Sequence, residues 1–457
     1  MTTVQSYLDA NRARHLEEMF SLLRIPSISA LSEHKTDVLT TAQWLANALT
    51  AAGLEHVAVM ETAGNPVVYA DYLHTPQAPT VLIYGHYDVQ PVDPLELWES
   101  PPFDPTVRSG KVYARGASDD KGQTFMHIKA IEALLSVNGT LPVNVKFCIE
   151  GEEEIGSPSL DAFVEQQRTL LAADVLVISD TTMHAPGQPA IVYGLRGLCA
   201  LQLDVRTAKS DLHSGLFGGA VPNAVHALVD VLETLHTADG RVAVTGFYDD
   251  VEPLSPEEKA AFAALPHDDE AYRKSLNLSA LHGETGYSTL ERIMARPTLE
   301  INGIYGGFQG EGTKTVIPAQ AHAKITCRLV NRQDPGQVLD LIEQHVARHT
   351  PPGAQITVTR FDSGRPFVTS FDSPAIKAAA SAYASAYGVE PFYMRMGGSI
   401  PVVETFGRVL QLPVVMMGFG LPDENFHAPN EHFSLENFDK GLTTLTTYYS
   451  TLTSFMK

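Results

Sequence analysis

Cysteine and long hydrophobic runs are scarce in this sequence, and each scarcity excludes a class of protein. The 457 residues include only three cysteines, Cys148, Cys199 and Cys327, which lie far apart inside apolar runs. They form no C-x-x-C pair, so we expect reduced core residues and neither a disulfide framework nor a cysteine metal site. No run of 18 apolar residues occurs, and the first 20 residues lack the apolar region of a signal peptide. These absences predict a soluble, cytoplasmic protein that has no membrane partner.

Basic residues are also few. Lysine and arginine together number 32, against 53 aspartates and glutamates, which gives a formal net charge of -21. Because no basic stripe is available to neutralise phosphates, nucleic acid is not an expected partner. Hydrophobic residues make up 44% of the chain, and this share and the length predict a globular protein of two domains.

Two common catalytic signatures are missing as well. The glycine-rich stretch at 303–312 lacks the G-K-[ST] ending of a phosphate-binding loop. No G-x-S-x-G sequence marks the nucleophile of a serine hydrolase. The chemistry must therefore be sought elsewhere in the chain.

Short apolar runs alternate with amphipathic segments over the first 180 residues. Residues 81–84 and 175–178 are continuously apolar, which is typical of strands buried on both faces of a parallel sheet. The spacing of apolar residues predicts a helix over 121–135, and Ser157 followed by Pro158 predicts the start of another. The predicted fold class is α/β with a mainly parallel central sheet.

The pattern changes after Gly194. Residues 200–205 and 323–329 alternate as half-buried strands do, with a predicted helix over 223–235 between them. From about Pro374 the first pattern returns, with a helix, an apolar strand at 414–417 and a closing helix at 435–452. We therefore expect a domain of residues 195–373 inserted between the two parts of a first domain, 1–194 and 374–457.

Acidic residues and histidines directly follow the predicted strands. His86 follows the first of them, the acidic run 152–154 follows residues 145–149, and Asp180 and His427 lie beyond two others. In open α/β sheets, ligands bind outside the carboxyl ends of the strands, so these segments can meet in one crevice. Carboxylate and imidazole groups hold Zn²⁺ or Mn²⁺. With the Asp119 and Asp120 pair, the pattern predicts a two-metal hydrolase site.

These segments carry a resemblance to a known family. The chain resembles the M20 family of metallopeptidases, and within it the carnosinase-like, cytosolic nonspecific dipeptidase branch, from about residue 19 to 438. The resemblance rests on the ordered sequences GHYDVQP at 85–91, RG at 115–116, DDKG at 119–122, EEIGS at 153–157, DLHSG at 211–215, KTVIP at 314–318, RLV at 328–330 and GGSIP at 397–401. It implies a zinc-peptidase-like catalytic domain and an inserted α+β lid and dimerisation domain.

The resemblance also implies a set of metal ligands for two divalent ions per subunit, Zn²⁺ or Mn²⁺. One ion would be held by His86 and Asp180, the other by Glu154 and His427, and Asp119 would bridge the two. The peptide bond after Asp119 would be cis. Three carboxylates and one hydroxide carry four negative charges, which matches two divalent cations.

Two further residues of this region would handle or position protons. Glu153 would take a proton from the metal-bridging water and return it to the leaving amine. The family pattern of two glutamates, a variable residue and Gly-Ser selects Glu153 and Glu154, and a shift to Glu152 is the alternative. Asp88 would accept the second ring N–H of His86 and fix its tautomer, unless it is a surface or capping residue.

Of the remaining implied site residues, two lie in the inserted domain and two in the second part of the catalytic domain. His213 would reach across a homodimer interface to polarise the scissile carbonyl oxygen, and Arg328 would pair with the C-terminal carboxylate of the substrate. Gly398 and Ser399 would offer backbone N–H groups from a turn. The alternatives are a structural or surface role for His213, a surface salt bridge for Arg328 and a plain structural turn at 398–399.

We therefore predict a metal-dependent dipeptidase that hydrolyses short peptides with a free C-terminal carboxylate. An N-acyl-amino-acid deacylase or a carboxypeptidase of the same fold is the alternative, and a panel of dipeptides, N-acetylated amino acids and longer peptides separates them. An inactive M20-like binding protein is a further alternative. Turnover that disappears with a chelator and returns with metal would exclude it.

Overall fold

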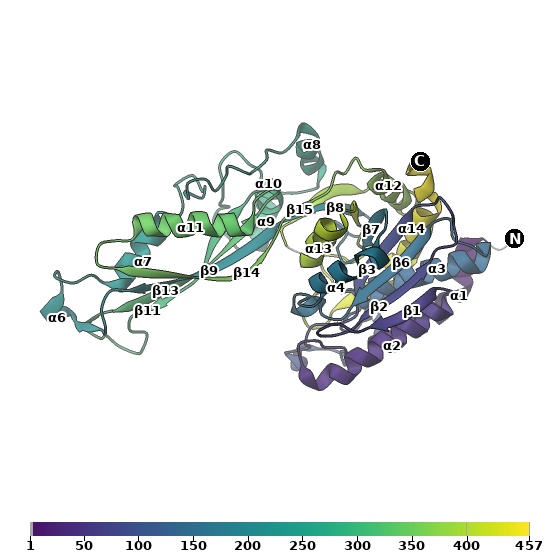
Figure 1. Cartoon of the computed structure of the whole chain (residues 1–457), viewed down its shortest axis with the longest axis horizontal. Helices are drawn as coiled ribbons and strands as arrows, with labels where there is room; N and C mark the ends of the chain where they lie inside the picture. Colours follow the sequence, from purple (N-terminus) through teal and green to yellow (C-terminus); the bar gives the residue numbers. More distant parts are fainter. Residues whose placement is uncertain (1–2, 399, 457) are drawn as a thin grey trace. The chain divides into compact units, whose positions relative to one another are not determined.

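The computed structural model describes residues 3–398 and 400–456, which form two compact units. The first comprises Met1–Tyr193, Thr369–Met394 and Pro401–Lys457. The second comprises Gly194–Val368 and the short segment Arg395–Ile400. The chain passes from the first unit to the second within strand β8 (Ala190–Leu195), and each unit has helices of its own (Figure 1).

Most of a nine-stranded sheet belongs to the first unit, and β15 with the last residues of β8 and β16 is counted with the second. The strand order of the sheet is β1-β2-β6-β3-β7-β17-β8-β15, and β16 also pairs with β8. The strands other than β8 are β1 (Glu55–Met60), β2 (Val67–Tyr72), β3 (Thr80–His86), β6 (Asn144–Glu150), β7 (Val175–Ile178), β15 (Phe367–Val368), β16 (Phe392–Met396) and β17 (Val414–Met416).

The sheet is mixed, which corrects the expectation of a mainly parallel one. The four central strands β6, β3, β7 and β17 run parallel, as the continuously apolar runs predicted. On either side of them, the pairings β1 with β2, β2 with β6, β17 with β8 and β8 with β15 are antiparallel. Only six residues join β1 to β2, and a parallel crossover needs about a dozen or more.

Helices cover both faces of this sheet. On β3, a side chain at Gly85 would meet Thr124 of α3, whereas the ring of Tyr84 lies 5.5 Å from that of Phe406 in α13. Because adjacent strand residues point to opposite faces, α3 and α13 lie on opposite sides (Figure 1). The helices of the unit are α1 (Val4–Leu23), α2 (Lys35–Ala51), α3 (Lys121–Asn138), α4 (Leu160–Gln166), α5 (Arg168–Leu171), α12 (Pro374–Tyr387), α13 (Pro401–Leu410) and α14 (Leu435–Phe455).

Shorter elements complete the first unit. They are the 3-10 helices η1 (Ser32–His34), η2 (Leu95–Leu97) and η3 (Glu153–Ile155) and a small sheet of β4 (Thr106–Arg108), β5 (Lys111–Tyr113) and β18 (His432–Ser434). One predicted helix start is wrong, because α4 begins at Leu160 and not after Ser157. Ser157 has a φ of 51° and donates its hydroxyl to buried Glu150 instead.

The second unit is built on an antiparallel sheet of order β11-β13-β9-β14. Its strands are β9 (Gly197–Arg206), β11 (Thr298–Gly306), β13 (Gln320–Leu329) and β14 (Gln355–Gly364), and a separate ladder joins β10 (Leu212–His213) to β12 (Val316–Ile317). Along β9 and β13 buried residues alternate with more exposed ones, as the sequence predicted. One face of the sheet therefore packs on a core, and the other does not.

Two helices cover the core side of this sheet. The apolar faces of α7 (Ala224–Glu233) and α11 (Pro335–His349) pack against the buried side of β9 and β13. Asn223 caps α7, its side-chain oxygen accepting from the backbone N–H of Val225 at 2.9 Å. The other helices of the unit are α6 (Ser214–Phe217), α8 (Pro256–Ala264), α9 (Asp269–Ser275) and α10 (Thr289–Ala295).

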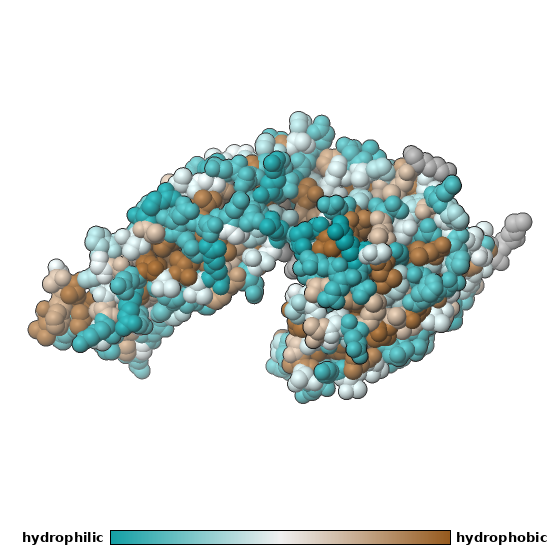
Figure 2. Space-filling view, in the orientation of Figure 1, coloured by the Kyte–Doolittle hydropathy of each residue, from teal (hydrophilic) through white to brown (hydrophobic). Residues whose placement is uncertain are grey.

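The end of the second unit that carries α6 is apolar at its surface. Figure 2 shows a brown, hydrophobic patch where Figure 1 labels this helix. Leu216 is 77% exposed and Phe217 is 41% exposed. In the described part of the chain, every helix is too short or too polar to cross a bilayer.

Candidate active site

The predicted metal ligands lie at one edge of the first unit's sheet. Each is placed by the end of a strand or the start of a helix. His86 ends β3, Asp119 precedes α3, Glu154 lies in η3 after β6, Asp180 follows β7, and His427 lies in the loop after β17. The parallel direction of these four strands brings their carboxyl ends, and hence the five side chains, together.

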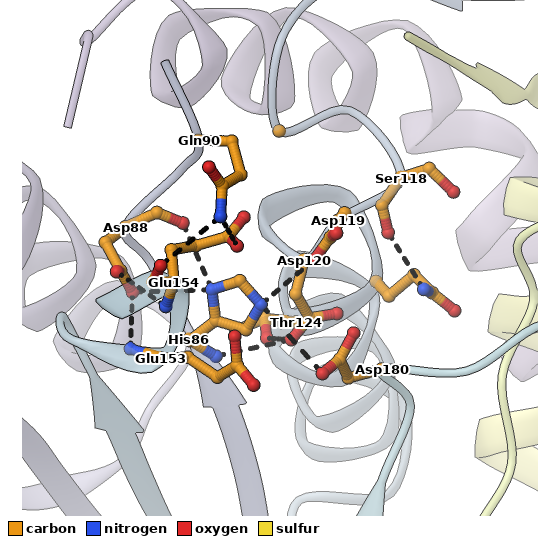
Figure 3. A network of polar contacts seen from close by, with 12 residues as sticks. His86, Asp88, Gln90, Ser118, Asp119, Asp120, Thr124, Glu153, Glu154 and Asp180 are labelled. Atoms are coloured by element: carbon orange, nitrogen blue, oxygen red, sulfur yellow. Dashed lines mark hydrogen bonds and ion pairs between the residues drawn. The ribbon is translucent and has the colours of Figure 1, made fainter. Parts of the chain in front are cut away.

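Asp119 lies between the two histidines. Its Oδ1 is 3.1 Å from Nε2 of His86, and its Oδ2 is 2.8 Å from Nε2 of His427. Asp180 Oδ2 is 4.0 Å from the same nitrogen of His86, and Glu154 Oε2 is 3.2 Å from that of His427. Figure 3 shows four of these residues, with His86 at the centre of the network.

Two groups of donor atoms result, and they share one residue. His86, Asp119 and Asp180 form the first group, and Asp119, Glu154 and His427 form the second. Within each group the donor atoms lie within 4.8 Å of one another. Each oxygen of the shared carboxylate faces a different group, which is the arrangement that a bridging ligand requires. The peptide bond between Asp119 and Asp120 is cis, as the resemblance implied.

The charges of the cluster suit cations. Burial, reinforced by the charge on Asp119, raises the pKa of Asp180 well above its usual range. Hydrogen bonds to Asp119 and Glu154 raise the pKa of His427 to about 10. Burial opposes a charge on His86, but Asp119 and Asp88 outweigh it and raise its pKa well above the ordinary value. Three carboxylates, of which Asp119 is buried and Glu154 and Asp180 are partly buried, thus draw positive charge to the centre, and mixed nitrogen and oxygen donors fit divalent metal ions.

Asp88 fixes the orientation of the His86 ring. Nδ1 of His86 is 3.0 Å from the backbone carbonyl oxygen of Asp88 and 3.4 Å from its carboxylate Oδ1. Because neither oxygen can donate, Nδ1 carries the proton and the lone pair of Nε2 faces Asp119. The sequence predicted the carboxylate as the partner, but the carbonyl is nearer.

The carboxylate of Asp88 also holds the glutamates of η3. It accepts from the backbone N–H of Glu153 at 3.2 Å and of Glu154 at 3.1 Å. The side chain of Glu152 is tied down in the same way, accepting from the amides of Asn65 at 3.0 Å and Ser159 at 3.2 Å. No backbone amide of the described residues holds the side chain of Glu153, and burial raises its pKa to about 7 against the opposing effect of His86.

The sequence assigned no individual role to two residues at this site. Gln90 donates from its side-chain nitrogen to Glu154 Oε2 at 2.8 Å (Figure 3). Asp120 accepts from the Thr124 hydroxyl at 2.6 Å and from the His86 amide at 3.3 Å. Both belong to the motifs that carry the resemblance, so their positions were visible but their partners were not.

The other predicted site residues belong to the second unit. His213 is exposed, and its Nδ1 accepts from the backbone N–H of Gly215 at 3.0 Å. Arg328 is half-buried on the face of β13 that points away from the core. A side chain at Gly398 would meet nothing within 4 Å, whereas one at Gly397 would lie 2.8 Å from the carbonyl oxygen of Ile293. The predicted residue Ser399 lies outside the described residues.

An α/β sheet whose strand ends carry two donor groups with a shared carboxylate defines a metallohydrolase. Residues 82–451 match the model of peptidase family M20/M25/M40, and the chain belongs to this family. It is 32% identical to the Cys-Gly metallodipeptidase dug1 of Schizosaccharomyces pombe, over 98% of this chain and 97% of that protein. It is 35% identical to the human Beta-Ala-His dipeptidase, over 82% of this chain and 75% of that protein.

Solved structures show the same likeness. Human carnosine dipeptidase 1 superposes with a TM-score of 0.77 at 30% identity, covering 99% of this chain and 98% of that chain. The M20 family metallo-carboxypeptidase Sso-CP2 from Sulfolobus solfataricus superposes with a TM-score of 0.83 at 34% identity, covering 96% of this chain and 99% of that chain. The predicted family, fold class and enzyme class are thereby confirmed.

Proposed function

We propose that this chain hydrolyses dipeptides and other short peptides with a free C-terminal carboxylate, using two divalent metal ions. The single observation that carries the proposal is the position of Asp119, whose two carboxylate oxygens each face one donor group. The similarity of the chain to the Cys-Gly and Beta-Ala-His dipeptidases supports dipeptides as the substrates.

The five clustered residues would hold the metals. His86 and Asp180 serve one ion, Glu154 and His427 the other, and Asp119 both. The set of two imidazoles and three carboxylates suits Zn²⁺ or Mn²⁺. When bound, such ions polarise a carbonyl group and make a water molecule more acidic.

Glu153 would act as the general base and acid. It takes a proton from the attacking water and passes it to the nitrogen of the leaving amine, so that the peptide bond breaks without releasing an amide anion. Asp88 supports this role because it fixes the backbone of Glu153 and the ring of His86 together. The two backbone contacts of Glu152 favour Glu153 over its neighbour as the base.

The second unit would bind the substrate and a partner subunit. In this proposal residues 195–373 form an inserted lid and dimerisation domain, and the enzyme is a homodimer. Arg328 pairs with the substrate carboxylate, and Gly398 offers a backbone N–H. The exposed Leu216 and Phe217 support a protein contact near His213, since apolar patches of this kind mark interaction sites.

His213 would stabilise the oxyanion in the partner's site. Because Nδ1 of this exposed residue accepts a hydrogen bond, the neutral ring carries its proton on Nε2 and can donate from there. We also place the enzyme in the cytoplasm, since Cys148, Cys199 and Cys327 are free and buried, as in a reducing compartment.

The test is a metal-dependent assay on defined peptides. Chelated protein, reloaded with Zn²⁺ or Mn²⁺, should hydrolyse Cys-Gly or β-Ala-His and release both amino acids. Activity should disappear with chelator and return with metal. Protein that binds metal but cleaves no dipeptide would contradict the proposal.

A carboxypeptidase is the second candidate, favoured by the likeness to the metallo-carboxypeptidase from Sulfolobus solfataricus. The same panel should include tripeptides, longer peptides and N-acetylated amino acids. A dipeptidase prefers the dipeptides, whereas a carboxypeptidase removes single residues from the longer ones. Preference for the acetylated substrates would indicate a deacylase instead.

A further inference from the structure

We propose that the buried ion pair of Arg115 and Glu431 sets the geometry of the metal centre by fastening three ligand-bearing segments to one another. The segments are 86–91, 115–119 and 427–431, which carry His86, Asp119 and His427. The inference rests on the proposed metal centre and assigns positioning roles to two residues that would not touch the metals.

Glu431 ties the segment of Asp119 to its own. One oxygen, Oε1, accepts from the backbone N–H groups of Ser118 at 3.0 Å and Asp119 at 3.1 Å. The other, Oε2, accepts from the backbone N–H of Gly116 at 2.9 Å and from Arg115 Nη1 at 2.8 Å. One side chain thus receives four donors from the loop that carries the shared ligand.

Arg115 extends the connection to the third segment. While Nη1 binds Glu431, Nη2 donates to the backbone carbonyl oxygen of Pro91 at 2.9 Å. The segment that begins at His86 ends at Pro91. The guanidinium group has two terminal nitrogens in a fixed plane, so it can bind both acceptors at once. A lysine has a single nitrogen and cannot reproduce this geometry.

The fourth residue before Glu431 is His427. This loop is also held by its backbone, because the amide of Ala114 donates to the carbonyl oxygen of Glu431 at 3.1 Å and His432 pairs with Tyr113. The position of His427 relative to Asp119 therefore depends on how segment 427–431 sits against segment 115–119. Glu431 is the side chain that fixes this contact.

Burial makes the arrangement sensitive to substitution. Arg115 is 1% exposed and Glu431 is 0% exposed, so neither charge can be satisfied by water if its partner is lost. In a Glu431→Gln protein, either orientation of the amide places its NH₂ group against two donors. The loops must then move apart, and the distance between the ligands they carry must change.

Glu424 offers a matched control. It is also 0% exposed and accepts from the Ser118 hydroxyl at 2.6 Å and from the backbone N–H groups of Leu421 at 2.9 Å and Ser434 at 2.8 Å. Among the described residues, Arg115 and the Asp119 amide donate to Glu431 and not to Glu424. Glu424→Gln should therefore impose a comparable cost on folding without acting on the shared ligand.

The experiment uses Co²⁺ as the probe, because its visible absorption reports coordination geometry. Full-length wild-type, Glu431→Gln and Glu424→Gln proteins are stripped of metal, titrated with Co²⁺, and compared by affinity, by spectrum and by the melting temperature of the metal-free protein. We expect Glu431→Gln to lose about 10- to 100-fold in Co²⁺ affinity and to change the spectrum, as loss of supporting contacts around metal sites does. Glu424→Gln should keep the wild-type spectrum and stay within about threefold in affinity.

Each other outcome contradicts a defined statement. Wild-type protein that binds no Co²⁺ would overturn the proposed metal centre itself. Wild-type binding with equal losses in the two glutamine variants, or with none, would overturn the positioning role alone. If Glu431→Gln does not fold, Arg115→Lys replaces it in the comparison. This variant keeps a positive charge beside the Glu431 carboxylate but loses the guanidinium group that also binds the Pro91 carbonyl oxygen. An unchanged Co²⁺ spectrum and affinity in that variant would also reject the inference.

Discussion

The two units place most of their functional polar residues in different surroundings, although the ligand His427 of the first unit is exposed. In the first unit, His86 is fully buried and Asp119 is 8% exposed, and the backbone amide of each donates to a buried carboxylate. In the second, His213 is exposed and Arg328 is half-buried on a sheet face that has no core against it. Ligands for a metal must be held in fixed positions, whereas residues that meet a substrate or another subunit must remain accessible.

This difference indicates which measurement separates the units. Substitutions at the buried cluster should change the amount of bound metal, because the donors themselves or their supports are lost. Substitutions at the accessible residues of the second unit should change turnover and leave the metal content intact. Metal analysis alongside kinetics therefore tests the comparison directly.

The largest effect is expected for Asp119→Ala. Both donor groups lose a member, so the protein should lose both metals and all measurable activity. His86→Ala removes a donor from one group only and should weaken mainly one ion. Elemental analysis of dialysed proteins checks this, and two tightly bound metals in Asp119→Ala would show that Asp119 is not the shared ligand.

Glu153→Gln should have the next largest effect, and it separates chemistry from metal binding inside the first unit. Its metals and fold should remain, because Glu153 belongs to neither donor group. Loss of the proton acceptor should lower kcat by at least about 10²- to 10⁴-fold. Glu152→Gln is the control, and an inactive Glu152→Gln beside an active Glu153→Gln would move the base by one residue.

The site residues that could be predicted from the sequence are those whose position follows from the neighbouring sequence. The ligands directly follow apolar strands or precede a helix. Because strands such as β3, β7 and β17 were expected to run parallel, their ends, and the ligands beyond them, were expected to meet. The partners of Glu431 could not be predicted, because its contact with the Asp119 amide joins residues 312 positions apart. No local pattern records which buried carboxylate such amides will meet.

The fold shows the same division between local and distant causes. Helix α3 and the central strands have the apolar spacing of their class, and they form as predicted. The sequence around Ser157 is typical of a helix N-cap. However, the hydroxyl groups of Ser157 and of the distant Tyr84 both donate to Glu150, and these contacts hold the turn in another conformation. At one edge, the antiparallel direction of β1 and β2 was missed because it follows from their six-residue connection and not from hydrophobicity.

His213→Ala tests the second unit. Removing a donor to the oxyanion should lower kcat by about 10²- to 10³-fold while the metal content stays unchanged.

If His213 acts in the partner's site, mixing this protein with inactive Glu153→Gln should restore activity, since one site of each heterodimer has both residues. Random exchange makes about half of the dimers mixed, so recovery should approach about a quarter of wild-type activity. Differently tagged chains confirm exchange, and background activity after confirmed exchange would place His213 in its own subunit or outside catalysis.

The smallest effect concerns a histidine of the first unit that serves the fold. His127 in α3 is buried between the Tyr449 hydroxyl at 2.6 Å and the Ser179 hydroxyl at 2.7 Å, and burial lowers its pKa to about 3. The unfolded chain, with the ordinary value of about 6.5, binds the proton first, so stability is complete above pH 6.5 and falls as the pH drops toward 3. The loss can reach about 1.4 kcal/mol per pH unit.

The melting temperature of the metal-free wild type should therefore fall more between pH 7 and pH 5 than that of His127→Gln, whereas the exposed control His226→Gln should follow the wild type. Parallel curves for wild type and His127→Gln would mean that His127 is not the neutral buried group described.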